Sequence, residues 1–310
     1  MNRFDRRDFL KASFSTAAAI AAGLNLPSAA KADKNKISCR DFQTSVSYSS
    51  KPWTNLNFYN DAKNFTFAIV SDRAGYFRPG VFNTAVDKLN LMLPEFVMSV
   101  GDLIDGNSGV TSVEMAQEKW DEFNYMVDRL RMPFFYVAGN HDHGYNDSLR
   151  QAWENNNGPK YYYFTYKNVL MLCLNTEEDN VDSMTDEQVR YFENVIKAHK
   201  DVRWTFLFFH NPLWMNKTPK PYWLKIESML GDRNYTVFAG HIHNYTKTVK
   251  NGRNYYTLAT TGGCGSGEGG NPSGPAKSEF DHFAWVTMTE KGPVIANIML
   301  DGVLDDEGKA

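Results

Sequence analysis

The sequence predicts a single α/β domain in which two β-sheets are layered together and helices lie on the outside. Two observations favour this class. Short apolar segments typical of buried strands alternate with longer segments of helical periodicity. The last part of the chain instead contains hairpin-like pairs of strands, which are antiparallel in character. Because 42% of the 310 residues are hydrophobic, the chain can form a proper core between such layers.

The predicted strands are short apolar runs, and two pairs of them form hairpins. Lys167–Asn168 and Asn251–Gly252 are the expected hairpin turns. The strand-forming segments are 65–70, 95–100, 132–138, 160–175, 204–209, 235–239, 245–259 and 283–300.

Three helices are predicted from apolar residues that recur every three or four positions. They cover 80–93, about 113–130 and 184–196. The third helix begins with a predicted capping box, in which Thr185 is the N-cap residue and Gln188 follows three residues later. In such a box each of the two side chains is bonded to the other residue's backbone N–H group.

The N-terminal segment 1–32 is predicted to be an export signal and not part of the fold. The pair Arg6–Arg7 precedes a short Ala-rich apolar run, and small residues surround the expected cleavage position after Ala32. The paired arginines resemble a twin-arginine signal, and the alternative is a surface amphipathic helix. The run is shorter than the ~20 apolar residues of a membrane span, so no stable anchor is expected. The mature protein would then be periplasmic or secreted.

The remainder of the chain is expected to hold one domain with two extensions. We assign 33–64 to an N-terminal extension, 65–300 to the domain and 301–310 to a C-terminal tail. The 33 basic and 36 acidic residues leave a net charge of −3, which argues against a broad nucleic-acid-binding surface. Three cysteines allow at most one disulfide, so disulfides are not expected to hold the fold together.

Residues suited to metal binding follow five of the predicted strands. Functional groups in α/β sheets gather at the carboxyl ends of strands, so these side chains are expected to converge. Each one alone has an ordinary explanation, such as a turn aspartate or a buried core histidine. Together, however, carboxylate, amide and imidazole groups form a typical ligand set for divalent ions. The residues are Asp72, Asp102, Asn140, His141, His210, His241 and His243.

The motifs SDRAG, GDLID, GNHD, FFHNPLW and GHIH occur in this order between about residues 65 and 261. In this respect the chain resembles the calcineurin-like metallophosphoesterase superfamily. GNHD together with GHIH is the specific part of the resemblance, whereas GD alone is a weak signal. The resemblance implies a four-layer αββα β-sandwich, with two mixed sheets flanked by helices. It also implies two divalent metal ions, Mn, Fe, Zn or Mg, at the strand ends.

The resemblance further implies a role for each site residue. Asp102 would bridge the two metals, and His141 would contact the phosphate and protonate the leaving oxygen. An imidazole is suited to this step because its ordinary pKa is near 6.5. Asp142 would support the site by orienting an imidazole. The other ligands would divide between the sites, with Asn140, His210 and His241 at one and Asp72 and His243 at the other.

The chain departs from the family pattern at one ligand position. The first motif of the family usually reads Asp-x-His, but here Ala74 follows Asp72 at that spacing. A methyl group cannot bind a metal, so this first site is expected to be weaker than the second. His143, Asp105 and Asn244 are close in sequence and could fill the position, and nothing in the sequence selects among them.

The expected function is hydrolysis of a small phosphate mono- or diester through attack by a metal-bound hydroxide. The alternative is a metal- or ligand-binding protein of the same fold with weak or lost catalysis. The presence of His141 argues against this alternative, because a pure binding protein has no use for a leaving-group acid. A serine hydrolase is disfavoured because no G-x-S-x-G motif occurs.

Overall fold

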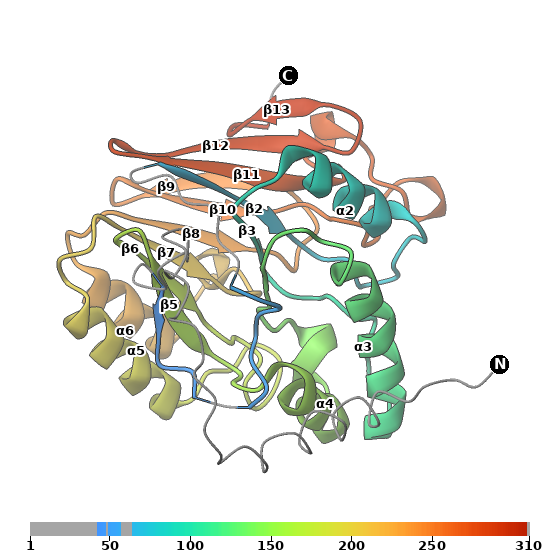
Figure 1. Ribbon diagram of the computed structural model, residues 1–310, viewed down its shortest axis with the longest axis horizontal. Helices are drawn as coiled ribbons and strands as arrows, with labels where there is room; N and C mark the ends of the chain where they lie inside the picture. Colours follow the sequence, from blue (N-terminus) through green and yellow to red (C-terminus); the bar gives the residue numbers. More distant parts are fainter. Residues whose placement is uncertain (1–41, 48, 57–63, 309–310) are drawn as a thin grey trace, which may run out of the picture. The chain divides into compact units, whose positions relative to one another are not determined.

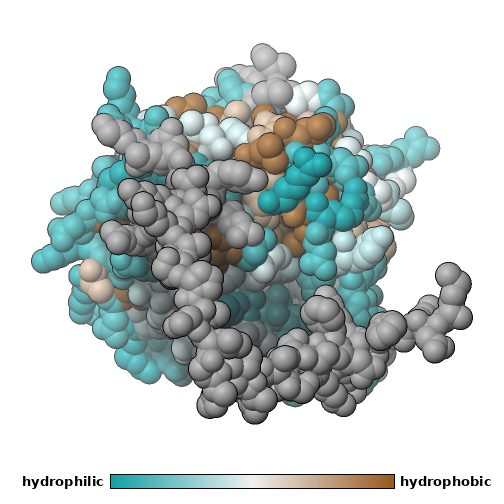
Figure 2. Space-filling view, in the orientation of Figure 1, coloured by the Kyte–Doolittle hydropathy of each residue, from teal (hydrophilic) through white to brown (hydrophobic). Residues whose placement is uncertain are grey.

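The structure is a computed structural model that describes residues 42–47, 49–56 and 64–308. The predicted export signal at 1–32 lies outside these ranges. Among the helices of the described residues, none is long and apolar enough to cross a membrane. The face shown in Figure 2 is mainly hydrophilic, with smaller hydrophobic areas between the polar ones.

The described strands form two mixed β-sheets (Figure 1), one with seven strands and one with six. In spatial order the seven-stranded sheet contains β1 (Gln43–Thr44), β5 (Tyr162–Tyr166), β6 (Val169–Cys173), β7 (Trp204–Phe208), β8 (Tyr235–Ala239), β10 (Arg253–Thr257) and β9 (Thr246–Lys250). The six-stranded sheet contains β13 (Val303–Asp305), β12 (Gly292–Met299), β11 (His282–Thr289), β2 (Phe65–Val70), β3 (Phe96–Ser99) and β4 (Phe134–Phe135).

Helices cover the outer faces of the two sheets. In Figure 1, α5 and α6 lie beside β5 to β8, whereas α2 and α3 lie beside the other sheet. The described α-helices are α2 (Val81–Met92), α3 (Val113–Val127), α4 (Asp147–Asn157), α5 (Asp186–Ala198) and α6 (Pro221–Leu230). The predicted four-layer αββα sandwich of two mixed sheets is therefore confirmed.

Among the described residues, three hydrophobic cores hold the layers together. The core between the sheets contains Phe67, which stacks on Phe96 of its own sheet and meets Phe206 of the other sheet edge to face. A second core joins the six-stranded sheet to α2, α3 and α4, and a third joins the other sheet to α5 and α6. The central strands are therefore covered on both faces, which is why they are continuous apolar runs.

The parallel strands at the centre of each sheet determine where a functional site can form. β2, β3 and β4 run parallel in one sheet, and β6, β7 and β8 run parallel in the other. Backbone bonds then join the segments that follow these strands: Asp72 N–H donates to Gly101, and Gly240 N–H donates to His210. The carboxyl ends that the sequence predicts to carry the ligands thus lie close together.

Both predicted hairpin turns are confirmed. Lys167 and Asn168 have φ values of 45° and 60°, and they connect the antiparallel strands β5 and β6. Asn251 and Gly252, at 52° and 70°, connect β9 to β10 in the same way. Positive φ at both central residues gives a turn whose twist matches that of the flanking strands.

The predicted capping box is half correct. The Thr185 hydroxyl accepts a hydrogen bond from the Gln188 N–H at 3.2 Å, as expected of an N-cap residue. The predicted return bond, in which the Gln188 side chain would accept the Thr185 N–H, is wrong, because the Gln188 Oε1 accepts the Asn175 N–H at 2.9 Å while its Nε2 donates to Asn175 and Glu178. Instead, Glu178 accepts the Thr185 N–H at 2.8 Å. Gln188 is fully buried, so its amide joins the helix to the loop after β6.

The segments predicted as extension and tail each contribute a strand. β1 pairs with β5, and β13 pairs with β12. The strand predicted at 132–138 contains only Phe134–Phe135 as regular strand, because the next N–H groups, of Tyr136 and Val137, donate to the Pro52 carbonyl and the Ser99 hydroxyl. The helices α4 and α6 are additional elements that the sequence analysis did not predict, and each buries a short apolar stripe that includes a tryptophan.

Candidate metal centre

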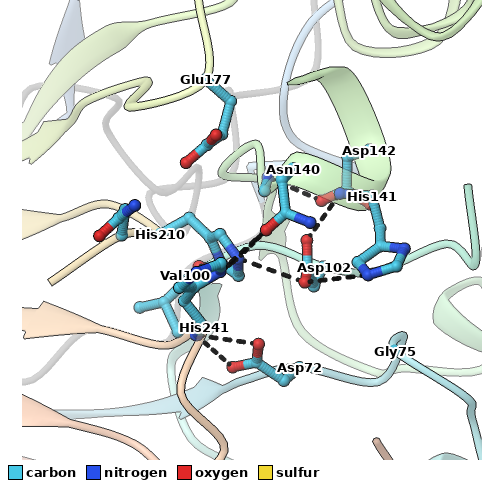
Figure 3. A network of polar contacts seen from close by, with 12 residues as sticks. Asp72, Gly75, Val100, Asp102, Asn140, His141, Asp142, Glu177, His210 and His241 are labelled. Carbon is cyan, nitrogen blue, oxygen red and sulfur yellow. Dashed lines mark hydrogen bonds and ion pairs between the residues drawn. The ribbon is translucent and has the colours of Figure 1, made fainter. Parts of the chain in front are cut away.

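The predicted ligands meet in one region, where they form two groups that share Asp102. One group combines Asp102 with His210 and His241, and the other combines Asp102 with Asp72 and His243. Within each group the potential ligand atoms lie within 4.8 Å of one another. Figure 3 shows that side chains from the ends of strands in both sheets point toward this common centre.

Asn140 completes the group around His210 and His241. Its Oδ1 lies 2.9 Å from Nε2 of His210 and 2.9 Å from Nδ1 of His241, and these two nitrogens are 3.1 Å apart. Oδ2 of Asp102 is 3.2 Å from the same His210 nitrogen. Asn140 begins a single π-helical turn, Asn140–Gly144. π-Helical turns are rare in proteins, and those that occur are often located at functional sites.

The chemistry of these four groups fits a divalent cation. Nδ1 of His210 lies 3.0 Å from the Val100 carbonyl and therefore donates to it, which leaves Nε2 directed at Asp102 and Asn140. A single proton on Nε2 cannot form hydrogen bonds to a carboxylate, an amide oxygen and the facing His241 nitrogen at the same time. A cation at this position would contact all of them, and the set suits Mn, Fe or Zn.

The group around Asp72 has fewer ligands. Nδ1 of His243 lies 2.6 Å from the Cys264 carbonyl and donates to it, so Nε2 faces Oδ1 of Asp72 at 3.4 Å. Ala74 is completely buried next to this group and contributes only a methyl group. The two groups therefore differ in imidazole count, as the sequence predicts.

The residues considered as a replacement have other partners, and neither Asp105 nor His143 joins the Asp72 group among the described residues. Asp105 accepts backbone N–H groups of the turn after β2, at 3.2 and 3.4 Å. His143 is buried and donates to the Glu177 carbonyl at 2.8 Å. The Asn244 amide donates to the Lys277 carbonyl at 3.2 Å. The position that Ala74 leaves open is therefore not filled by these side chains.

Backbone and hydroxyl donors orient the two carboxylates. The Ser71 hydroxyl and the His241 N–H both donate to Asp72, the latter at 2.9 Å. The His141 N–H donates to Oδ1 of Asp102 at 2.9 Å. Several ligands also have left-handed backbone conformations, which are strained for non-glycine residues and cluster at functional sites. Their φ values are 29° for Asp72, 57° for Asp102, 73° for His241 and 54° for His243.

In the absence of metal, the charges of the centre strongly shift the pKa values of its imidazoles. Burial opposes a charge on His210, but Asp102 outweighs burial and raises the pKa of His210 to about 10. Likewise, burial opposes a charge on His243, but Asp72 raises the pKa of His243 to about 9. Burial and the neighbouring His210 lower the pKa of His241 to about 4. A metal ion that binds here must therefore displace protons from His210 and His243.

Two glycines are required because the carboxylates approach their backbone. A side chain on Gly240 would overlap the Asp72 carboxylate and would lie 2.8 Å from the Ser71 hydroxyl. A side chain on Gly139 would overlap the Asp102 carboxylate. Each glycine directly precedes a predicted ligand, so its lack of a Cβ lets two ligand segments come into contact.

His141 stands at the edge of the centre. Its Nδ1 donates to the Gly106 carbonyl, so the free Nε2 faces inward, 3.9 Å from Oδ2 of Asp102. Its side chain is partly exposed, in contrast to that of His210. The geometry therefore leaves one nitrogen of His141 available to a molecule that enters the centre.

The predicted role of Asp142 as the residue that orients an imidazole is wrong. Its Oδ1 accepts the N–H groups of Leu103 and Ile104, at 2.8 and 2.9 Å, and its Oδ2 accepts that of Gly139 at 2.9 Å. Burial, together with the charge of Asp102, raises the pKa of Asp142 to about 7. Asp142 thus fixes the two loops that carry the ligands, and backbone carbonyls orient the imidazoles instead.

The start of the glycine-rich segment forms part of the centre. Gly263 N–H donates to the Asp72 carbonyl at 2.8 Å, and Cys264 N–H donates to the Gly75 carbonyl at 3.2 Å. A side chain on Gly263 would lie 2.6 Å from the Ala74 carbonyl. This attachment places the Cys264 carbonyl where it can accept the His243 proton.

Sequence reasoning missed two polar side chains beside the centre. The Tyr145 hydroxyl accepts the Asn140 amide at 3.0 Å, and this bond turns the amide oxygen toward the imidazoles. Glu177 is fully buried near His210 (Figure 3), and burial raises its pKa to about 7 although His210 opposes the shift. Neither residue follows its strand directly, so the strand-end pattern could not find them. The position of Tyr145 within five residues of Asn140 was the only signal.

Solved structures share this fold. The structure of purple acid phosphatase PPD1 from yellow lupin (Lupinus luteus) seeds aligns with a TM-score of 0.59 and 16% identity, over 79% of this chain and 53% of that one. A structure described as GAP50, the anchor in the inner membrane complex of Plasmodium, aligns with a TM-score of 0.56 and 16% identity, over 77% and 85% of the two chains. At these identities the likeness shows the fold alone.

A curated protein and a family model also match the sequence. The protein is the uncharacterized YvnB of Bacillus subtilis (strain 168), which is 26% identical over 206 residues. The match covers 58% of this chain but only 15% of YvnB, so the chain spans a small part of that relative. The model described as calcineurin-like phosphoesterase matches residues 65–245, which is more than half of the chain and contains the whole ligand set. The chain therefore belongs to the calcineurin-like phosphoesterase family.

Proposed function

We propose that this protein is an exported, metal-dependent hydrolase of phosphate mono- or diesters. The observation that carries the proposal is the shared position of Asp102 between two groups of potential ligands, next to the inward-facing Nε2 of His141. Two divalent ions held by these groups would offset the charge of a phosphate ester and acidify a water molecule for attack on phosphorus. The candidate ions are Mn, Fe, Zn and Mg.

The residues of this chain have distinct tasks in the proposed reaction. Asp102 is held by the backbone of His141 and belongs to both ligand groups, so it sets their spacing. Asn140 presents its amide oxygen because Tyr145 binds the nitrogen end of the amide. The Gly106 carbonyl holds Nδ1 of His141, so Nε2 is the nitrogen that faces the centre and would carry the proton to be transferred. A proton on Nε2 would pass to the leaving oxygen of the ester.

Asp102→Asn tests the shared ligand. The substitution keeps the shape of the side chain but removes the charge common to both groups. We expect phosphoesterase activity to fall below detection and metal content, measured by elemental analysis after dialysis, to decrease. The matched control is Asp147→Asn, because the Asp147 side chain is 99% exposed and makes only a local ion pair with Arg150. Normal turnover with unchanged metal content in Asp102→Asn would refute the assignment.

His141→Ala tests proton delivery. We expect kcat on alkyl phosphates to fall by about 10²–10⁴-fold, because an alkoxide needs a proton to leave. The loss with p-nitrophenyl phosphate should be much smaller, because p-nitrophenolate leaves without a proton. His199→Ala serves as the control, since His199 caps α5 and is bonded to the Val195 carbonyl outside the centre. Equal losses on both substrates would mean that His141 only positions the ester.

Ala74→His tests the weaker group. We expect the wild type to keep one ion tightly and to lose the other on dialysis, because the Asp72 group has a single imidazole. An added imidazole should raise the metal affinity of the weak site by about 10-fold or more. This is the loss of affinity that follows when even a residue that only orients a metal ligand is removed. Ala74→Leu adds similar bulk to this buried position without a ligand atom, so it controls for packing. Two equally tight ions in the wild type would contradict the prediction.

A binding protein without turnover is the second candidate. One observation favours it: the buried Ala74 removes a ligand that the family motif usually provides. The fold is also found in GAP50, a protein described as an anchor. The hydrolase remains the better proposal because an anchor has no need for an inward-facing, partly exposed imidazole. Activity assays with added Mn²⁺, Zn²⁺ or Mg²⁺ distinguish the two.

The proposed export rests on the N-terminal sequence. Arg6–Arg7, the Ala-rich run and the small residues before Asp33 support a twin-arginine signal that is removed after Ala32. Protein recovered from the periplasm or medium should therefore begin at Asp33 in N-terminal sequencing. Replacement of both arginines by lysine should retain the precursor in the cytoplasm. Export of that variant at the normal rate would refute the twin-arginine assignment.

A further inference from the structure

Two tyrosines border His141 on the accessible side of the metal centre. The Tyr145 ring meets the His141 ring edge to face, with centroids 5.3 Å apart. Tyr76 follows Gly75, whose backbone is so close to His141 that an added Cβ would lie 3.9 Å from Nε2. Figure 3 shows the His141 ring on the same side of the centre as Gly75. Tyr76 is 84% exposed and Tyr145 41% exposed, so both rings are accessible.

The backbone of Tyr76 is held in an unfavourable conformation. Its φ is 63°, and large residues seldom adopt the left-handed region. The Asp105 carboxylate maintains this turn by accepting the N–H groups of Gly75 at 3.2 Å and Tyr76 at 3.4 Å. The ring itself gains little from packing, since most of it is exposed. A fixed, strained turn that passes His141 thus presents an aromatic ring to solvent, and packing in the core does not explain this arrangement.

Tyr145 is fixed at its other end. Its hydroxyl accepts the Asn140 amide at 3.0 Å, and Asn140 belongs to the metal centre. This bond and the contact with His141 restrict the position of the ring. The accessible edge of the centre therefore has two aromatic residues, with Tyr145 held through its hydroxyl and Tyr76 through its backbone N–H.

We propose that Tyr76 and Tyr145 form a subsite for a planar aromatic group in the alcohol part of the phosphate ester. The inference rests on the proposed function, in which His141 gives its proton to the leaving oxygen. The alcohol part must then lie against His141, next to both rings. Aromatic rings bind one another in stacked or edge-to-face arrangements, and tyrosine adds a polar end that tolerates water. The expected substrates are phosphate esters of aryl-bearing alcohols or of nucleosides, which share this planar group.

Binding can be tested without turnover by using two phosphonates of similar size. These are 2-phenylethylphosphonate and 2-cyclohexylethylphosphonate, titrated by calorimetry into the mature protein in Mn²⁺. We expect the phenyl ligand to bind about 2- to 10-fold more tightly in the wild type, the scale of one aromatic pair. Tyr76→Asn should abolish this preference while keeping a residue that accepts positive φ. Tyr76→Phe should retain the preference, as should Tyr125→Ala, which removes an exposed ring of α3.

The outcomes separate the subsite from the proposed reaction. Equal binding of the two phosphonates, binding of neither, or an unchanged preference in Tyr76→Asn would overturn the subsite. A Tyr76-dependent preference without hydrolysis of the matching phosphate esters would support the subsite and refute the hydrolase. Tyr145→Phe removes the hydroxyl that binds Asn140 and should weaken the binding of both phosphonates, but it keeps the ring, so the preference should remain; a lost preference would overturn the subsite. A second titration then compares the affinity for uridine 5′-phosphate with that for ribose 5-phosphate. Tighter binding of the first distinguishes nucleosides from other aryl alcohols.

Discussion

The structure depends on keeping electronegative atoms close together although they repel one another. Two carboxylates, an amide oxygen and several imidazole nitrogens face one buried region, and Asp102 is common to both groups. Apolar packing within the centre cannot offset this repulsion. The fold instead fixes the chain segments from outside, through parallel strands, left-handed residues and backbone donors. In the absence of metal, the negative charges of Asp102 and Asp72 raise the pKa values of His210 and His243. Protons on these two imidazoles therefore offset part of the negative charge.

The layers of the fold could be predicted because burial leaves a periodic signal. Strands covered on both faces are continuous apolar runs, as in Phe65–Val70, and the outer helices have one apolar face. Elements with a weak signal were harder to predict. The helix Asp147–Asn157 is polar, with three consecutive asparagines at its end, and it buries few side chains. The edge strand Gln43–Thr44 has only two residues, so it depends on its partner strand and not on its own pattern.

The ligands could be predicted because their side-chain types are unusual at successive strand ends. The groups that orient them could not, because any residue provides a backbone carbonyl or N–H. Asp142 was misassigned for this reason: a carboxylate beside a histidine suggests a side-chain partner, whereas it binds the backbone of Leu103, Ile104 and Gly139. Whether another side chain replaces the missing ligand at Ala74 could not be predicted either, because it depends on the paths of the loops that carry the candidates. The structure directs all three candidates to other partners.

The use of main-chain carbonyls to hold the imidazoles affects how this site can change over time. His210, His243 and His141 each donate to a carbonyl, from Val100, Cys264 and Gly106 respectively. Substitution of the residue that owns a carbonyl leaves the carbonyl itself in place, so the tautomers tolerate point mutations in the supporting loops. An insertion or deletion in the same loops would move the carbonyl away and allow the ring to rotate. Loop length, more than loop composition, is therefore the inherited property on which the reactivity of these histidines depends.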